Sequence, residues 1–252
     1  MYKRQPTTCG AGSESSNVTI AEFIQKNSKM GLADDALYAD YAVLIPELLE
    51  ELPYEFFATS AIDALIHGIE SYVSPKASLY TEMFSRKAME MILHGFKKIV
   101  NGGPEVRFEL LEEFLVASDL AGIAFGNAGT GAVHAMSYPL SGEYHVPHGE
   151  ANYQFLTAVF QKYVQIKPEG KIRQLNEFLA GILLCKPEQV YGELEQLLDR
   201  IIPRKRLSQY GMKEAEITTF AKSVEESQQR LLNQSYIKFD AEAMAEIYRE
   251  LY

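Results

Sequence analysis

Apolar residues recur every three to four positions through most of the chain after residue 53, which is the spacing of one face of an α-helix. Helix-ending signals such as Pro75 and the pair Gly102-Gly103 separate these stretches. The pattern therefore predicts a mainly α-helical, multi-helix domain. The expected helices cover about residues 59–74, 79–100 and 104–125, a segment bearing His134, and then 149–165, 169–183, 187–202, 212–231 and 239–251.

Two of these helices carry more detailed predictions. Thr59 or Ser60 is expected to cap the first helix, because a side-chain hydroxyl can accept a hydrogen bond from the free amides of a helix N-terminus. In the second helix, seven apolar residues at helical spacing are expected to face the core. They are Met83, Phe84, Ala88, Met91, Ile92, Phe96 and Ile99.

The first fifty residues follow a different pattern. Turn-forming residues fill positions 6–14, and residues 41–45 form a short apolar run of strand character that Pro46 stops. No Gly-x-Gly-x-x-Gly motif follows a strand anywhere in the sequence. We therefore expect two parts: residues 1–50 as a remnant of an α/β nucleotide-binding domain, and residues 51–252 as the helical domain.

Composition narrows the functional class. A hydrophobic content of 47% with 23% charged residues is typical of a soluble globular protein. The net charge of −10 argues against a nucleic-acid partner, and no apolar run is long enough to span a membrane. Two cysteines, Cys9 and Cys185, make no disulfide framework. These features predict a soluble globular protein of the reducing cytoplasm.

Three histidines and one aspartate are candidate metal ligands. Asp63 and His67 are four residues apart, which places their Cβ atoms about 5–6 Å apart on one helix face. His134 follows a glycine-rich segment, and His148 stands between a proline and a glycine. A single Asp-x3-His pair is more often a histidine satisfied by a neighbouring acid. The four residues together favour a site for Fe²⁺ or Zn²⁺, which accept one carboxylate and neutral imidazoles.

Other residues near this group have two interpretations. The Tyr138 phenol could pass a proton to or from an alcohol oxygen, although a buried tyrosine with one hydrogen bond is more common. Glu70 could orient the imidazole of His67, and an exposed helix acid is an equally good interpretation. His145 could lie in the surroundings of the same site.

Four motifs resemble the iron-containing (group III) alcohol dehydrogenases. They are Pro6-Thr-Thr-Cys-Gly-Ala-Gly-Ser-Glu14, Asp63-Ala-Leu-Ile-His67-Gly-Ile-Glu-Ser-Tyr72, Gly122-Ile-Ala-Phe-Gly-Asn-Ala-Gly129, and His134-Ala-Met-Ser-Tyr-Pro-Leu140 followed by Val146-Pro-His-Gly-Glu-Ala-Asn152. The resemblance implies a helical C-terminal domain of the dehydroquinate synthase-like type. It also implies one Fe²⁺, sometimes Zn²⁺, held by Asp63, His67, His134 and His148.

The residues of the last motif are most similar to those of one branch of this family. That branch oxidises 4-hydroxybutyrate to succinate semialdehyde with NAD. Many relatives carry a second histidine at the position of Tyr138. The resemblance further implies cofactor contacts at Thr7, Thr8 and Lys29, a small alcohol or aldehyde as substrate, and a homodimer. A substrate carboxylate would need a cation, for which Lys76 and Arg86 are candidates.

Members of the family begin with a nucleotide-binding domain whose Gly-Gly-Gly-Ser turn binds the pyrophosphate, and this turn is absent from the sequence. A truncated gene product is therefore the expectation from the resemblance. Two alternatives to a dehydrogenase stay open. One is a non-catalytic, metal-binding helical fragment, and the other is a metal-dependent hydrolase.

Overall fold

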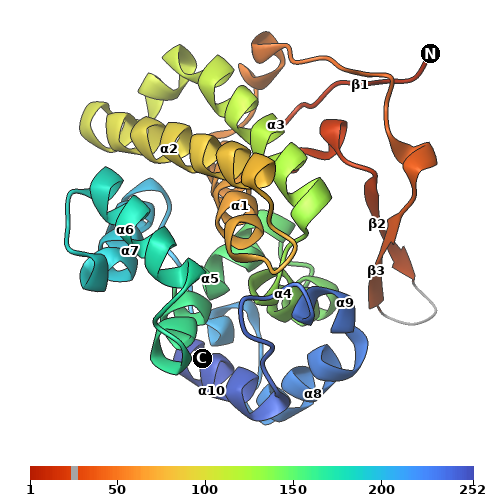
Figure 1. Ribbon diagram of the computed structural model, residues 1–252, viewed down its shortest axis with the longest axis vertical. Helices are drawn as coiled ribbons and strands as arrows, with labels where there is room; N and C mark the ends of the chain where they lie inside the picture. The colour runs from red at the N-terminus through yellow and green to blue at the C-terminus, as the bar shows by residue number, and fades with distance from the viewer. Residues whose placement is uncertain (24–27) are drawn as a thin grey trace.

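The computed structural model describes the backbone of residues 1–23 and 28–252 and the side chains of residues 1–19 and 32–252. The described chain is mainly α-helical, as the hydrophobic pattern predicts (Figure 1). None of its described helices is long and apolar enough to cross a membrane. The helices are α1 (Tyr54–Val73), α2 (Leu79–Gly102), α3 (Leu111–Ala128), α4 (Ala132–Tyr144), α5 (His148–Ile166), α6 (Lys171–Leu183), α7 (Val190–Ile201), α8 (Ile217–Ser227), α9 (Gln229–Leu232) and α10 (Ala241–Leu251).

Helix α1 is the centre of the fold. It packs against α2 and α3 on one side and against α5 and α6 on the other (Figure 1). From Phe57 to Val73 every residue except Ser60 is buried, so the helix has no solvent-exposed face. A helix surrounded in this way is apolar on all sides, and the few polar side chains that it carries inside need a specific partner.

The expected start of α1 was wrong. The helix begins at Tyr54, directly after Pro53, and Thr59 and Ser60 lie inside it. Their hydroxyls donate to backbone carbonyls of the preceding turn, Thr59 to Glu55 at 2.9 Å and Ser60 to Phe57 at 3.1 Å. Serine and threonine can satisfy their hydroxyls in this way within a helix, so their presence alone does not mark an N-cap. The helix ends before Pro75, as predicted.

Helix α2 agrees with its predicted bounds and ends before Gly103, whose φ of 94° suits glycine. Its N-cap is Ser78, which forms a reciprocal capping box with Thr81. Four of the seven residues expected on its inner face are buried, namely Ala88, Ile92, Phe96 and Ile99, whereas Phe84 and Met91 are half-buried. Met83 is 60% exposed, so this part of the prediction was wrong. Leu79 and Tyr80 in the first turn of α2 are also 72% and 73% exposed, so this end of the helix faces solvent.

Some predicted helices are interrupted in the structure. Residues 104–125 divide into a 3-10 helix, Pro104–Glu109, and α3. Residues 212–231 divide into α8 and the short α9. A hydrophobic pattern does not register such breaks, because 3-10 turns and short helices continue the same exposed and buried faces.

The N-terminal fifty residues form two small strand pairs at the side of the helices (Figure 1). β1 (Lys3–Arg4) pairs in parallel with β4 (Tyr41–Ala42), and β2 (Val18–Phe23) pairs antiparallel with β3 (Ser28–Ala33). The predicted strand at residues 41–45 is therefore real but shorter than expected. A parallel pair of strands distant in sequence is typical of an α/β arrangement.

Two glycines let the N-terminal segment approach the helices at backbone distance. A Cβ atom on Gly10 would lie 2.5 Å from the carbonyl oxygen of Ser60 in α1. A Cβ atom on Gly12 would lie 2.4 Å from the Cα of Gly122 in α3, and Gly12 also has a positive φ of 55°. No other residue type fits these contacts without displacement. The glycine-rich turn thus fixes the segment against the helical domain.

Candidate metal centre

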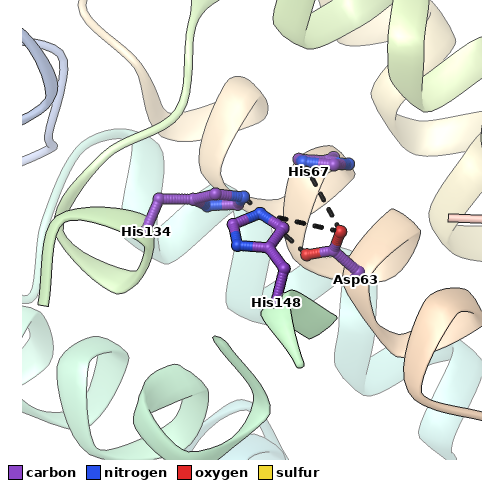
Figure 2. Close-up of side chains that lie close together, drawn as sticks. All are labelled: Asp63, His67, His134 and His148. Atoms are coloured by element: carbon purple, nitrogen blue, oxygen red, sulfur yellow. Dashed lines mark ion pairs between the residues drawn. The ribbon is translucent and has the colours of Figure 1, made fainter. Parts of the chain in front are cut away.

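The side chains of Asp63, His67, His134 and His148 point toward one another (Figure 2). One ligand atom from each lies within 4.8 Å of the ligand atoms of the other three. The Asp63 carboxylate is central, at 4.0 Å from His67 Nε2, 3.8 Å from His134 Nε2 and 3.9 Å from His148 Nε2. One carboxylate and three imidazoles at these separations could hold a single divalent ion.

Three helices supply these four side chains (Figure 2). Asp63 and His67 occupy successive turns of α1, so their i, i+4 spacing places them on one face as predicted. His134 lies in the first turn of α4, after the glycine-rich link from α3. His148 is the first residue of α5, directly after Pro147 at the N-cap.

The burial of the cluster supports a role for a cation. Asp63, His67 and His134 are each 4% exposed or less, whereas His148 is half-buried. Within the described part of the chain, the buried Nε2 atom of His134 has no hydrogen-bond partner. A buried polar nitrogen without a partner is costly. A metal ion among the four side chains would satisfy it.

Glu70 orients His134, and not His67 as the sequence suggested. The Glu70 carboxylate lies 2.6 Å from His134 Nδ1 and accepts a hydrogen bond from the Val133 amide at 2.7 Å. Glu70 is 2% exposed, so the interpretation as an exposed helix acid was also wrong. Because the Glu70 carboxylate accepts a hydrogen bond from Nδ1–H of His134, the Nε2 atom of that ring is left with its lone pair directed at the cluster.

Two further contacts orient the remaining side chains. His67 Nδ1 faces the carbonyl oxygen of Gly10 at 3.1 Å, and the ring of His67 stacks on Phe125 with centroids 4.3 Å apart. The amide of Asn152 donates to Asp63 Oδ1 at 2.7 Å and accepts from the Ser137 hydroxyl. The sequence analysis missed Asn152, although its position four residues after His148 on α5 was a usable signal.

The pKa shifts within the cluster favour ligand forms at two positions. Burial raises the pKa of Asp63, but the electrostatic effect of the neighbouring histidines and the hydrogen bond from Asn152 outweigh it and hold that pKa below its usual value. Burial lowers the pKa of His67 to about 3, so its imidazole is neutral at neutral pH. Burial also disfavours charge on His134, but its hydrogen bond to Glu70 and the nearby carboxylates raise its pKa.

The cluster lies on the wall of a cavity of about 530 Å³. Tyr138, one turn after His134 on α4, lines this cavity and is 8% exposed. Its ring centroid is 6.2 Å from that of His148. Burial raises the pKa of Tyr138 to about 12, and the positive charge of Arg230, which also lines the cavity, opposes this shift. The phenol is therefore protonated at neutral pH.

Other candidate residues lie away from the cluster. Thr7 is exposed and Thr8 half-buried, and neither lines the described part of the cavity. Lys29 belongs to β3, but its side chain lies outside the described residues. His145 is exposed at the end of α4. Of the two candidate cations, Lys76 lines the cavity, whereas Arg86 donates to the Tyr72 hydroxyl at 2.7 Å and stacks on the rings of Tyr72 and Phe178.

The sequence is similar to that of known proteins. Residues 57–252 match the family model described as Fe-containing alcohol dehydrogenase family, C-terminal. The chain is 56% identical over 247 residues to 4-hydroxybutyrate dehydrogenase from Clostridium kluyveri, covering 98% of this chain and 67% of that relative.

Solved structures share the fold. An iron-containing alcohol dehydrogenase from Thermotoga maritima superposes with a TM-score of 0.80 at 26% identity, over 98% of this chain and 62% of the other. Sulfoacetaldehyde reductase from Bifidobacterium kashiwanohense, solved in complex with NAD⁺, has a TM-score of 0.84 at 24% identity, over 98% of this chain and 63% of the other. The chain thus spans about two thirds of the length of these proteins. It belongs to the iron-containing alcohol dehydrogenase family.

Proposed function

We propose that the protein is a metal-dependent alcohol dehydrogenase that reversibly oxidises 4-hydroxybutyrate to succinate semialdehyde with NAD. One observation carries this proposal: the four convergent donor side chains open onto a cavity that Lys76 and Arg230 also line. The cavity thus offers one region suited to an alcohol oxygen and another suited to a carboxylate. The 56% identity to 4-hydroxybutyrate dehydrogenase supports the same substrate.

Asp63, His67, His134 and His148 would hold the metal, with Fe²⁺ favoured by the family and Zn²⁺ compatible with the same donors. When bound there, a divalent ion supplies Lewis acidity that lowers the pKa of an alcohol hydroxyl. The surrounding side chains would keep the donors in place. Glu70 fixes His134, Asn152 fixes Asp63, and the Gly10 carbonyl fixes His67.

Tyr138 would handle the proton of the reaction. Because burial raises its pKa to about 12, the phenol keeps its proton at neutral pH and is a donor rather than a base. In the direction of aldehyde reduction it would donate to the substrate oxygen as hydride reaches the carbonyl carbon. In the direction of oxidation the alcohol would pass its proton to the Tyr138 oxygen while the phenol releases its own proton to solvent, and hydride would leave the carbinol carbon for the nicotinamide.

The nicotinamide cofactor would accept the hydride, and the protein would align the two reactants. A protein of the same fold, sulfoacetaldehyde reductase, has been solved with NAD⁺, which supports NAD as the cofactor. We further propose that residues 51–252 form the metal-binding catalytic domain and that residues 1–50, including Thr7, Thr8 and Lys29, belong to the nucleotide-binding part. Homodimer formation and a cytoplasmic location stay predictions from the sequence.

The test is NADH formation by the purified chain, loaded anaerobically with Fe²⁺, from 4-hydroxybutyrate, 1-butanol, 1,3-propanediol and ethanol. We expect the highest kcat/KM for 4-hydroxybutyrate, and a loss of turnover in His134→Ala but not in His94→Ala, whose side chain is exposed on α2. Turnover of 1-butanol equal to that of 4-hydroxybutyrate would contradict the proposed substrate. Phosphatase activity without nicotinamide would support a hydrolase instead.

A further inference from the structure

Two basic side chains stand out among the described residues that line the metal-centre cavity. They are Lys76, which follows the end of α1, and Arg230 in α9. The one acidic residue among the described lining residues is Asp63, which is already engaged with the histidines. Away from that cluster, the described wall therefore has an excess of positive charge.

Arg230 has no neutralising partner within the described part of the chain. None of the described carboxylates forms an ion pair with its guanidinium, and none of the described acceptors forms a hydrogen bond with it. The contrast with Arg204 is clear, because Arg204 forms ion pairs with both Glu195 and Asp199. A guanidinium presents parallel N–H donors that match the two oxygens of a carboxylate. Arg230 thus has its full donor capacity available to a ligand.

Lys76 forms a hydrogen bond with a neutral side chain, Gln234, at the same cavity. The side-chain amide of Gln234, oriented so that both of its polar atoms are satisfied, donates to the Thr130 carbonyl at 3.2 Å and accepts from Lys76 Nζ at 3.1 Å. Gln234 is 8% exposed and so provides a fixed support. Because an amide does not neutralise an ammonium group, the charge of Lys76 also remains available.

These two cations counter the charge of the whole chain. A net charge of −10 repels an anionic substrate, so a local positive region is needed to bind one. Both cations also share a cavity with the reacting groups, since His134 and Tyr138 line the same cavity.

We propose that Arg230, assisted by Lys76, binds the carboxylate of a hydroxy-acid substrate whose hydroxyl lies at the cluster of Asp63 and the three histidines. This inference rests on the proposed dehydrogenase function and assigns the residues that select an ω-hydroxy acid over a neutral alcohol. The pyrophosphate of a dinucleotide carries similar oxyanion chemistry. The carboxylate is favoured because both cations line the same cavity as the metal-centre cluster.

The first test measures binding without turnover. Butyrate has the carboxylate and chain length of the substrate but no hydroxyl, and its affinity for the Zn²⁺-loaded chain can be measured by calorimetry. We expect Arg230→Gln to weaken butyrate binding about tenfold or more, the loss typical of a charged hydrogen bond. Lys76→Gln should weaken it about threefold or more, and Arg230→Lys should restore part of the loss. Arg249→Gln, on the exposed side of α10, removes the same charge and should leave the affinity unchanged.

The same variants are then titrated with inorganic pyrophosphate. If Arg230→Gln and Lys76→Gln lose pyrophosphate binding but keep butyrate binding, the cations serve the cofactor and the proposal fails. Absence of butyrate binding to the unmodified chain, or equal binding by all variants, would also overturn it. Lys76 and Arg230 are both exposed, and a thermal melt verifies that each variant is folded.

Kinetics separates this inference from the proposed function. We expect Arg230→Gln to lower kcat/KM for 4-hydroxybutyrate about tenfold or more while that for 1-butanol stays unchanged. Equal losses for both substrates would contradict a carboxylate contact while leaving the dehydrogenase function standing. If no alcohol is oxidised but butyrate binding still depends on Arg230, the proposed function fails and the carboxylate site stands.

Discussion

Glu70 Oε2 lies 2.6 Å from His134 Nδ1, although the two residues are 64 positions apart and belong to different helices. The second oxygen of Glu70 accepts from the Val133 amide, so the carboxylate fixes both the imidazole and the start of α4. A buried carboxylate that serves a histidine in this way typically sets the orientation and basicity of a metal ligand.

Replacing Glu70 by glutamine should therefore weaken metal binding without removing a ligand. We expect the affinity for Zn²⁺ or Fe²⁺ to fall about 10- to 100-fold. Competition with a chelator of known affinity measures the change. Glu113→Gln, at an exposed position of α3, is the matched control and should bind metal like the original chain. Unchanged affinity in Glu70→Gln would mean that the contact is only structural.

The identity of the ligands is tested by His134→Ala. Removal of one of four donors should reduce the bound metal from about one equivalent to a small fraction at micromolar protein. Elemental analysis after desalting gives the stoichiometry. His94→Ala removes an exposed histidine of α2 and should retain the metal. Full occupancy in His134→Ala would exclude His134 from the site.

Metal should also raise the thermal stability of the folded chain. A ligand at 100 times its Kd that binds only the folded state adds about 2.7 kcal/mol to the free energy of unfolding. We expect the melting temperature to rise on addition of Zn²⁺ and to return on chelation. The Asp63→Asn variant loses the charged ligand at the centre of the cluster and should respond far less. An equal response from Asp63→Asn would place the stabilising metal elsewhere.

Glu14 gives the protein a pH dependence outside the metal centre. Burial raises its pKa to about 7 from an ordinary 4.5, and the nearby Asp119 adds to this shift. Between pH 4.5 and 7 the folded chain thus binds more protons than the unfolded chain, so stability falls as pH rises through about 7.

This contribution can be isolated by substitution. When the pH rises from 5.5 to 8, ionisation of Glu14 should lower the free energy of unfolding by about 2 kcal/mol. Denaturant unfolding at both pH values measures the loss, and Glu14→Gln should remove most of it. If the variant and the original chain lose equal stability, Glu14 is already ionised at pH 5.5.

The contact between Gly12 and Gly122 should tolerate no side chain. A Cβ atom on Gly122 would lie 2.2 Å from the Gly12 carbonyl oxygen, so Gly122→Ala must displace the N-terminal segment or α3. We expect a loss of about 1–3 kcal/mol in denaturant unfolding. Gly181→Ala is the control, because its Cβ would meet nothing within 4 Å on the exposed side of α6. It should gain about 0.5–1 kcal/mol from helix propensity. A neutral Gly122→Ala would show that the segment is not fixed there.

The sequence by itself determined the helical class and most of the helices, because a buried helix face leaves a period of three to four residues in the chain. It also placed Asp63 and His67 on one face, since that relationship depends only on helix geometry. Glycine and proline signals gave the ends of α1 and α2 correctly. The motifs shared with the family identified the remaining two histidines of the cluster.

Only the tertiary structure decided which groups meet across helices. The sequence paired Glu70 with His67, its neighbour on α1, because contacts within one helix are the ones that spacing reveals. Packing turns Glu70 toward His134 on α4 instead. Likewise, nothing in the local sequence separates Arg86, which stacks on aromatic rings, from Arg230, which lines the cavity. The difference depends on long-range packing, and a local pattern does not encode it.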